Sequence, residues 1–251
     1  MSRNTVDLAP GLARGDVKIK GSRARFQMAL LACGGLYSVL YVVANDLVAS
    51  TRYKGYSRMS QAISELSATG PPTKPSHIAI LPIFSLLLIA FGIGVWKSAH
   101  RKRALRVTGG LLIVHGITAV LWLPFPITSR EDMIEGTAAV NDIGHIVLSA
   151  VSVLLILSQI GFGAAAFGRR FRLYSVVTAV TVVVFGALTG MQSSKVSAGG
   201  ATPWMGLFER ISLWSWLVWM AVLAVAIMRA EAGRAGTVFL RRPALGRREA
   251  L

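Results

Sequence analysis

Six long apolar runs constrain this chain more than any other feature of its sequence. Each run holds roughly 18 to 24 residues, the length that an α-helix needs to cross about 30 Å of hydrocarbon. The runs are too long for barrel strands, and polar residues do not alternate with apolar ones along them. The sequence therefore predicts an all-α polytopic membrane protein, a six-transmembrane-helix bundle with spans at about residues 26–48, 76–96, 107–125, 144–167, 174–191 and 211–228.

The composition leaves little room for a separate soluble domain. Hydrophobic residues make up 53% of the 251 residues, and charged residues make up 15%. A soluble domain usually carries about 25% charged residues. Only two basic tails, residues 1–25 and 230–251, fall outside the expected membrane domain of residues 26–229. Because Cys33 is the only cysteine, an intrachain disulfide is excluded.

The net charge of +16 is distributed unevenly between the two sides of the membrane. When the spans are threaded in order, twenty of the 27 Lys and Arg residues fall on the side of the tails and seven on the other. Lys and Arg stay on the cytoplasmic side. We therefore expect a multi-pass protein of the cell (plasma) membrane with both termini cytoplasmic. The basic tails would then lie on anionic lipid headgroups, which argues against nucleic acid as a partner.

A polar stretch of twenty residues, Tyr56–Pro75, separates the first two spans on the uncharged side. Met59, Ile63 and Leu66 follow one another at i, i+4 and i+7, which places them on one face of a helix. A glycine and two prolines come next and would end that helix. The spacing predicts a short amphipathic extracytoplasmic helix between spans one and two, from Arg58 to Ala68, lying on the outer ends of the spans.

Three segments of the chain carry recognisable motifs. They are ISELSATGPPTKP (Ile63–Pro75), NDIGHIVLSAVS (Asn141–Ser152) and GLFERISLWSWLVW (Gly206–Trp219). In kind, order and spacing they resemble the motifs of the "domain of unknown function 998" family of prokaryotic six-span integral membrane proteins. The resemblance covers about residues 26–229 and implies a six-span fold and a membrane location. It implies no activity, because that of the family is unassigned.

Polar residues gather at the outer ends of the spans and in the loop between the first two. Ionisable groups at a membrane boundary cost free energy to place there, so they are candidates for a functional site. The candidate binding residues are Asp46, Glu65, His77, Asp142, His145, Glu209 and Arg210.

Asp142 and His145 stand three residues apart, on one face of a helix. Such a pair favours a structural Asp–His hydrogen bond, but an acid–base pair for catalysis stays open, with Glu65 as a third participant. The catalytic candidates are therefore Asp142, His145 and Glu65. A metal site would lack a clear third and fourth ligand, so we expect neither a metal ion nor a cofactor.

Glu209 and Arg210 are neighbours on a predicted helix, so their side chains point about 100° apart and cannot pair with each other. We expect Arg210 to reach Glu65 or Asp142 and so to hold the outer loops in place. The alternative is an arginine that receives a lipid phosphate or a substrate carboxylate. His115, in the middle of the third span, is expected to hydrogen-bond to a neighbouring helix; a proton relay is the alternative.

Three functions stay open for such a chain. The leading hypothesis is a non-enzymatic membrane protein whose outer polar cluster binds a lipid or a protein partner. The second is a membrane-embedded enzyme that acts on a lipid or small amphiphile at the outer leaflet, and the third is a transporter. The sequence contains no P-loop, dinucleotide fingerprint or nucleophile elbow, which leans against an enzyme. Small residues such as Gly161, Gly186 and Gly190 could bring helices close together, within the chain or in a homo-oligomer.

Overall fold

The structure is a computed structural model and describes residues 9–136 and 140–240. Over these ranges the regular structure is entirely helical. Its elements are α1 (Ala9–Leu40), the π-helix η1 (Tyr41–Val48), α2 (Ala49–Thr51), the 3-10 helix η2 (Ile63–Ser67), α3 (Lys74–Lys97), α4 (Arg103–Thr118), the 3-10 helix η3 (Ala119–Trp122), α5 (Arg130–Ile134), α6 (Val140–Ala165), α7 (Arg169–Ser193) and α8 (Met205–Leu240).

Six helices are long and apolar enough to cross a membrane, which confirms the all-α six-span prediction. They cover Gly21–Thr51, Lys74–Lys97, Arg103–Trp122, Asn141–Ala165, Arg169–Ser193 and Met205–Arg234. The third was expected to run to residue 125 but ends at Trp122. Pro124 and Pro126 follow, and proline has no backbone N–H with which to continue a helix.

The six spanning helices form a closed ring in chain order. α1 packs on α3, α3 on α4, α4 on α6, α6 on α7 and α7 on α8, and α8 returns to pack on α1. Short connections at one end favour this order, because they force consecutive helices to lie antiparallel and side by side. The first and last spans are therefore direct neighbours.

Large side chains from α8 contribute much of the centre of the ring. Trp216, Trp219 and Met220 are at most 2% exposed, and they belong to the same cluster as Leu88 and Phe91 of α3. α3 and α4 approach one another closely, because a Cβ added at Gly109 would lie 2.6 Å from the backbone nitrogen of Trp96. Large side chains of α8 therefore fill much of the core, and glycine lets α3 and α4 pack closely.

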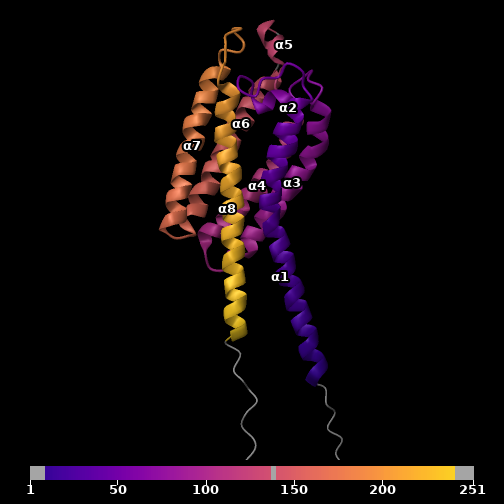
Figure 1. The fold of residues 1–251 in the computed structure, drawn as a ribbon, viewed down its shortest axis with the longest axis vertical. Helices are drawn as coiled ribbons and strands as arrows, with labels where there is room; N and C mark the ends of the chain where they lie inside the picture. The colour runs from indigo at the N-terminus through magenta and orange to yellow at the C-terminus, as the bar shows by residue number, and fades with distance from the viewer. Residues whose placement is uncertain (1–8, 137–139, 241–251) are drawn as a thin grey trace, which may run out of the picture.

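The two ends of the bundle differ in what they carry. The segments 52–73 and 123–136, with η2 and α5, lie at the end that we call the capped end (Figure 1). α1 begins and α8 ends at the opposite end, the tail end, where both helices extend beyond the other four (Figure 1). The expected basic tails lie partly in these helices and partly outside the described residues.

The amphipathic helix expected from Arg58 to Ala68 is shorter than predicted. Turns occupy residues 58–60, and only Ile63–Ser67 form a helix, of the 3-10 type. Ile63 and Leu66 are buried as the spacing predicted, whereas Met59 is 44% exposed. The backbone before Ile63 bends because its carbonyl groups bond to α8 instead of continuing a helix.

Candidate functional site

A buried ion pair between the first and last spans lies at the centre of the capped end. The guanidinium of Arg210 in α8 contacts both carboxylate oxygens of Asp46 in η1, with Nε–Oδ2 at 3.0 Å and Nη2–Oδ1 at 2.8 Å. Asp46 is completely buried and Arg210 is 4% exposed. Two-point contacts of this kind fix both side chains more firmly than a single hydrogen bond does.

The other donors of Arg210 bind the loop between the first two spans. Nη1 donates to the carbonyl oxygens of Arg58 and Gln61, at 2.7 and 3.1 Å. Nη2 also donates to the hydroxyl of Tyr56 at 2.8 Å. That hydroxyl in turn donates to the carbonyl oxygen of Ala62 at 2.7 Å. Arg210 therefore binds three residues of this loop to the bundle.

Two of the sequence motifs meet in this contact. Glu209 accepts a hydrogen bond from the backbone N–H of Ile63, the first residue of the ISEL motif. Gly206 lets the loop lie directly on α8, since a Cβ there would collide with the carbonyl oxygens of Gln61 and of Arg58, the latter 2.5 Å away. The glycine, the glutamate and the arginine of GLFER thus each contact the loop that carries ISEL.

The expected pairing of Arg210 with Glu65 is wrong. Glu65 pairs with Arg130 of α5, whose Nη2 and Nε lie 2.8 and 3.1 Å from its two carboxylate oxygens. The carboxylate of Glu65 also accepts from the backbone N–H of Ala62, at the start of η2. The reason for the difference is that the buried carboxylate of Asp46 already binds the guanidinium of Arg210, while α5 brings Arg130 to Glu65. Two ion pairs therefore replace the single one that the sequence suggested.

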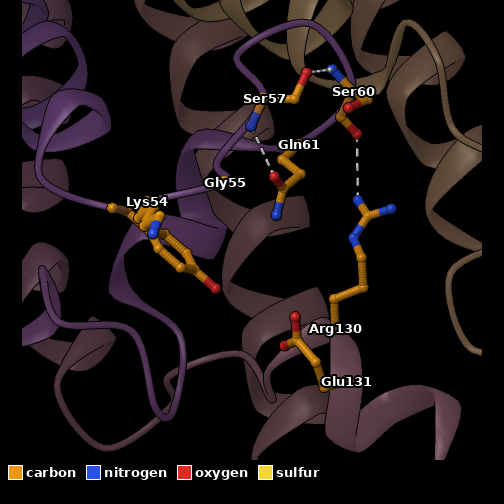
Figure 2. A pocket seen from close by; sticks show the side chains of 8 residues that line it. Lys54, Gly55, Ser57, Ser60, Gln61, Arg130 and Glu131 are labelled. Atoms are coloured by element: carbon orange, nitrogen blue, oxygen red, sulfur yellow. Dashed lines mark hydrogen bonds between the residues drawn. The ribbon is translucent and has the colours of Figure 1, made fainter.

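A pocket of about 420 Å³ lies beside the Glu65–Arg130 pair. Figure 2 shows Lys54 and Gly55 on one side of it and Arg130 with Glu131 on the other. Its remaining lining residues are Tyr53, Ser57, Ser60 and Gln61. Arg130 is held by its own contacts, because Nη1 donates to Thr202 and Nη2 to the Ser60 carbonyl as well as to Glu65.

The titratable groups of this pocket are of two kinds: some have a set charge, and others carry a charge that no other described residue binds. The hydrogen bonds that Arg130 donates to the Glu65 carboxylate raise the pKa of Arg130, so its charge is permanent. Burial, together with Glu131 and Glu65, raises the pKa of Tyr53, and burial raises that of Tyr56, so both phenols stay neutral. Among the described residues, no hydrogen bond or ion pair occupies the ammonium of Lys54 or the carboxylate of Glu131.

The π-helix η1 brings a second group of polar atoms to the capped end. Widened turns of this kind are often found at functional sites. Here the carbonyl oxygen of Asn45 lies 3.2 Å from Nε2 of His77, while Nδ1 of that ring lies 3.1 Å from the Thr73 carbonyl. A carbonyl only accepts, so a neutral imidazole satisfies one of the two contacts and a protonated one satisfies both. His77 therefore joins the first two spans at their outer ends.

Asp142 and His145 both contact the connection between η3 and α5. Asp142 accepts from the backbone N–H of Thr128 at 2.7 Å. His145 lies 3.0 Å from the Phe125 carbonyl through Nδ1, which must therefore carry the proton. The ring of Trp122 packs edge-on against His145. These contacts give the pair a role in holding the connection, which in turn bonds to the first loop through the N–H of Thr69 and the Ile127 carbonyl.

Gln159 of α6 is a polar residue within a spanning helix that was not among the predicted site residues. Its amide nitrogen lies 3.1 Å from Nδ1 of His115, and its oxygen accepts from Nε1 of Trp216 at 3.1 Å. His115 also stacks on Trp216. The expected hydrogen bond from His115 to a neighbouring helix is confirmed. A lone glutamine within an apolar run was the signal that could have identified its partner.

Within the part of the chain that the structure describes, no three His, Cys, Asp or Glu side chains come together as a metal ion would require. The small-residue positions Gly161 and Gly190 face open space, since a Cβ there would meet nothing within 4 Å. They therefore do not mediate helix contacts inside the bundle.

The comparison with known proteins gives one match. The model of the family described as "Protein of unknown function (DUF998)" matches residues 32–226. This range includes all three sequence motifs and every capped-end residue described above, and it confirms the resemblance. Neither a curated protein nor a solved structure matches the chain.

Proposed function

The chain belongs to the DUF998 family, whose function is unknown, and from this premise we propose that it is a non-enzymatic membrane protein that binds a zwitterionic ligand at its capped end. The ligand would carry one anionic and one cationic group, as the headgroup of phosphatidylethanolamine does. The observation that carries the proposal is the pair of unoccupied charges, Lys54 and Glu131, on the pocket beside Arg130.

The two charges suit the two halves of such a ligand. Lys54 offers three donors to a phosphate or carboxylate. Glu131 offers a carboxylate to an ammonium group, and the ring of Tyr53, which lies within its electrostatic reach, can stack on the same cation. The pocket volume of about 420 Å³ falls within the usual range for small-molecule sites.

The charge distribution supports a proposal for the side of the membrane on which the pocket opens. Twenty of the 27 Lys and Arg residues belong to the tails and the tail-end connections. Because positive residues stay in the cytoplasm, the tail end is proposed to be cytoplasmic in the cell membrane and the capped end extracytoplasmic. The pocket would then open at the outer membrane surface, within reach of the outer leaflet.

An enzyme and a transporter have less support. The backbone of a loop engages Nδ1 of His145 and Oδ1 of Asp142, which supports a structural role for both side chains. In the middle of the bundle, His115, Gln159 and Trp216 are buried and bonded to each other. A transport path would need polar groups that face water along the bilayer.

The test is a binding titration with the purified full-length chain in micelles. The probes are short-chain phosphatidylethanolamine, free phosphoethanolamine and a short-chain phosphatidic acid, which lacks the ammonium group. The wild type should bind at least one of the two zwitterions more tightly than the phosphatidic acid. Binding of phosphatidylethanolamine alone would assign the site to lipid, and equal binding of phosphoethanolamine would assign it to a free headgroup.

Two pairs of variants separate the pocket from general surface charge. Lys54→Gln and Glu131→Gln should each weaken binding about fivefold, as expected for one partly exposed charge contact. Lys195→Gln and Glu135→Gln remove equivalent exposed charges at the capped end and should leave binding unchanged. The proposal fails if the wild type binds neither zwitterion, or if the control variants lose as much affinity as the pocket variants.

A further inference from the structure

An apolar groove runs along the junction where the ring of helices closes. It lies between α1 and α8 and has a volume of about 730 Å³. Its walls are lined by Val39 of α1, Val42 of η1, and Leu217, Ala221 and Val225 of α8. Figure 1 shows α1 and α8 diverging toward the tail end, away from the contact that joins them.

A hydrogen bond fixes how the two helices align in depth. The hydroxyl of Ser38 donates to the Leu217 carbonyl at 2.8 Å. From these two residues the helices descend antiparallel to the tail end. Arg229 lies twelve residues below Leu217 and Arg25 thirteen residues below Ser38, which at 1.5 Å per residue is about 18 and 20 Å. The two arginines therefore lie at nearly the same depth.

Both arginines belong to the groove or continue it. Arg229 is itself a lining residue. Arg25 lies fourteen residues before Val39, about four turns of α-helix, and so on nearly the same face of α1. Both side chains are exposed, and neither forms an ion pair with a residue in the described ranges. The apolar groove thus ends at Arg229, and Arg25 stands at a similar depth on the neighbouring helix.

We infer that this groove holds one acyl chain of an anionic phospholipid from the tail-end leaflet, with Arg25 and Arg229 binding its phosphate. An apolar wall suits the chain, and one leaflet is about 15 Å deep, which the groove exceeds. Two cations at its mouth select a headgroup with net negative charge. This site lies at the opposite end of the bundle from the proposed zwitterion pocket and does not depend on it.

The test uses the full-length chain in nanodiscs of equimolar phosphatidylcholine and phosphatidylglycerol with identical acyl chains. Native mass spectrometry after release from the nanodiscs counts the lipids that each chain retains. The wild type should retain one phosphatidylglycerol in preference to phosphatidylcholine. Equal retention of the two lipids would overturn the inference, since it would show contact without selection.

Variants test the two halves of the site separately. Arg25→Gln with Arg229→Gln should lower phosphatidylglycerol affinity about 30-fold, as two surface charges predict. Ala221→Phe should fill the groove and abolish retention, although it changes no charge.

Matched controls exclude trivial causes. Arg169→Gln with Arg172→Gln removes two exposed tail-end charges from α7, and Ala187→Phe adds the same bulk to an exposed face of α7. Both controls should retain the lipid. Loss in either control, retention in Ala221→Phe, or a dimer that dissociates when Ala221 is replaced would overturn the inference; the last outcome would assign the groove to a second copy of the chain.

Discussion

Replacement of Arg210 is the most informative perturbation of the capped end. Its guanidinium is 4% exposed and holds a completely buried carboxylate, that of Asp46. Arg210→Ala leaves that carboxylate with only Arg58 nearby, at 3.5 Å and without a hydrogen bond from its Nε. Breaking a buried ion pair by removing one partner costs about 3–5 kcal/mol. We expect Arg210→Ala to lie at the upper end of this range, because the loop carbonyls of Arg58 and Gln61 also lose their donor.

The expected coupling distinguishes the true partner from the one that the sequence suggested. Asp46→Ala should cost less than Arg210→Ala, since Arg210 retains the Tyr56 hydroxyl and three carbonyl acceptors. The double variant should cost about 2–3 kcal/mol less than the sum of the two single variants, as for residues in direct contact. The corresponding cycle with Glu65→Ala should show a smaller coupling, because Glu65 is paired with Arg130.

The measurement is equilibrium unfolding of the purified chain in mixed micelles with a rising mole fraction of sodium dodecyl sulfate. Tryptophan fluorescence and circular dichroism follow the transition, and coincident curves would justify a two-state free energy. A coupling between Asp46 and Arg210 below about 0.5 kcal/mol would refute the reasoning, because that is the usual error of additivity between independent sites. A larger coupling to Glu65 than to Asp46 would refute it as well.

Three further predictions concern the contact at Gly206, the hydrogen bonds of Gln159 and the orientation of the chain in the membrane. Gly206→Ala should detach the loop from α8 and expose residues 52–62 to rapid hydrogen exchange, whereas Gly190→Ala, in open space, should leave the exchange pattern unchanged; unaltered protection in Gly206→Ala would contradict this. Gln159→Leu removes the partners of His115 and Trp216 and should cost about 1–3 kcal/mol, so a variant as stable as the wild type in the micelle assay would count against a structural role. If the capped end is extracytoplasmic, an impermeant thiol reagent should label Ser194→Cys but not Arg101→Cys on intact cells, each in a Cys33→Ala background. Both positions are exposed. The reverse labelling pattern would overturn this orientation.

The spans were predictable because membrane insertion depends on a property that the sequence states directly, the length of each apolar run. The tail-end boundaries of the first and last helices were not predictable, since helices continue there through Arg- and Lys-rich segments that are not apolar. α1 and α8 extend well beyond the expected spans for this reason. The short helix α5, with Ser129 accepting from the N–H of Asp132, carries a capping residue that the sequence could have revealed.

Partner choice at the capped end was harder to predict. Glu65, Asp142 and Asp46 all stand at similar depth in the sequence reading, and periodicity alone does not say which carboxylate faces α8. The carboxylate that pairs with Arg210 is that of Asp46, which lies in the π-helix η1, and no residue pattern predicted this helix. Arg130 had no apparent role in sequence, since it stands in a long connection without periodicity. Its contact with Glu65 depends on how two loops meet.

Closure of the ring by its first and last members sets an order of events during synthesis. Asp46 and Arg210 are separated by 164 residues, and ribosomes add roughly 5–20 residues per second, so the carboxylate waits about 8–33 s for its cation. Through that interval the Asp46 carboxylate of the nascent first span lacks the guanidinium of Arg210, and Arg58 is the cation nearest to it. A chain truncated before α8 would never gain Arg210 as a partner for Asp46. We therefore expect such a truncated chain to be recognised as misfolded and degraded.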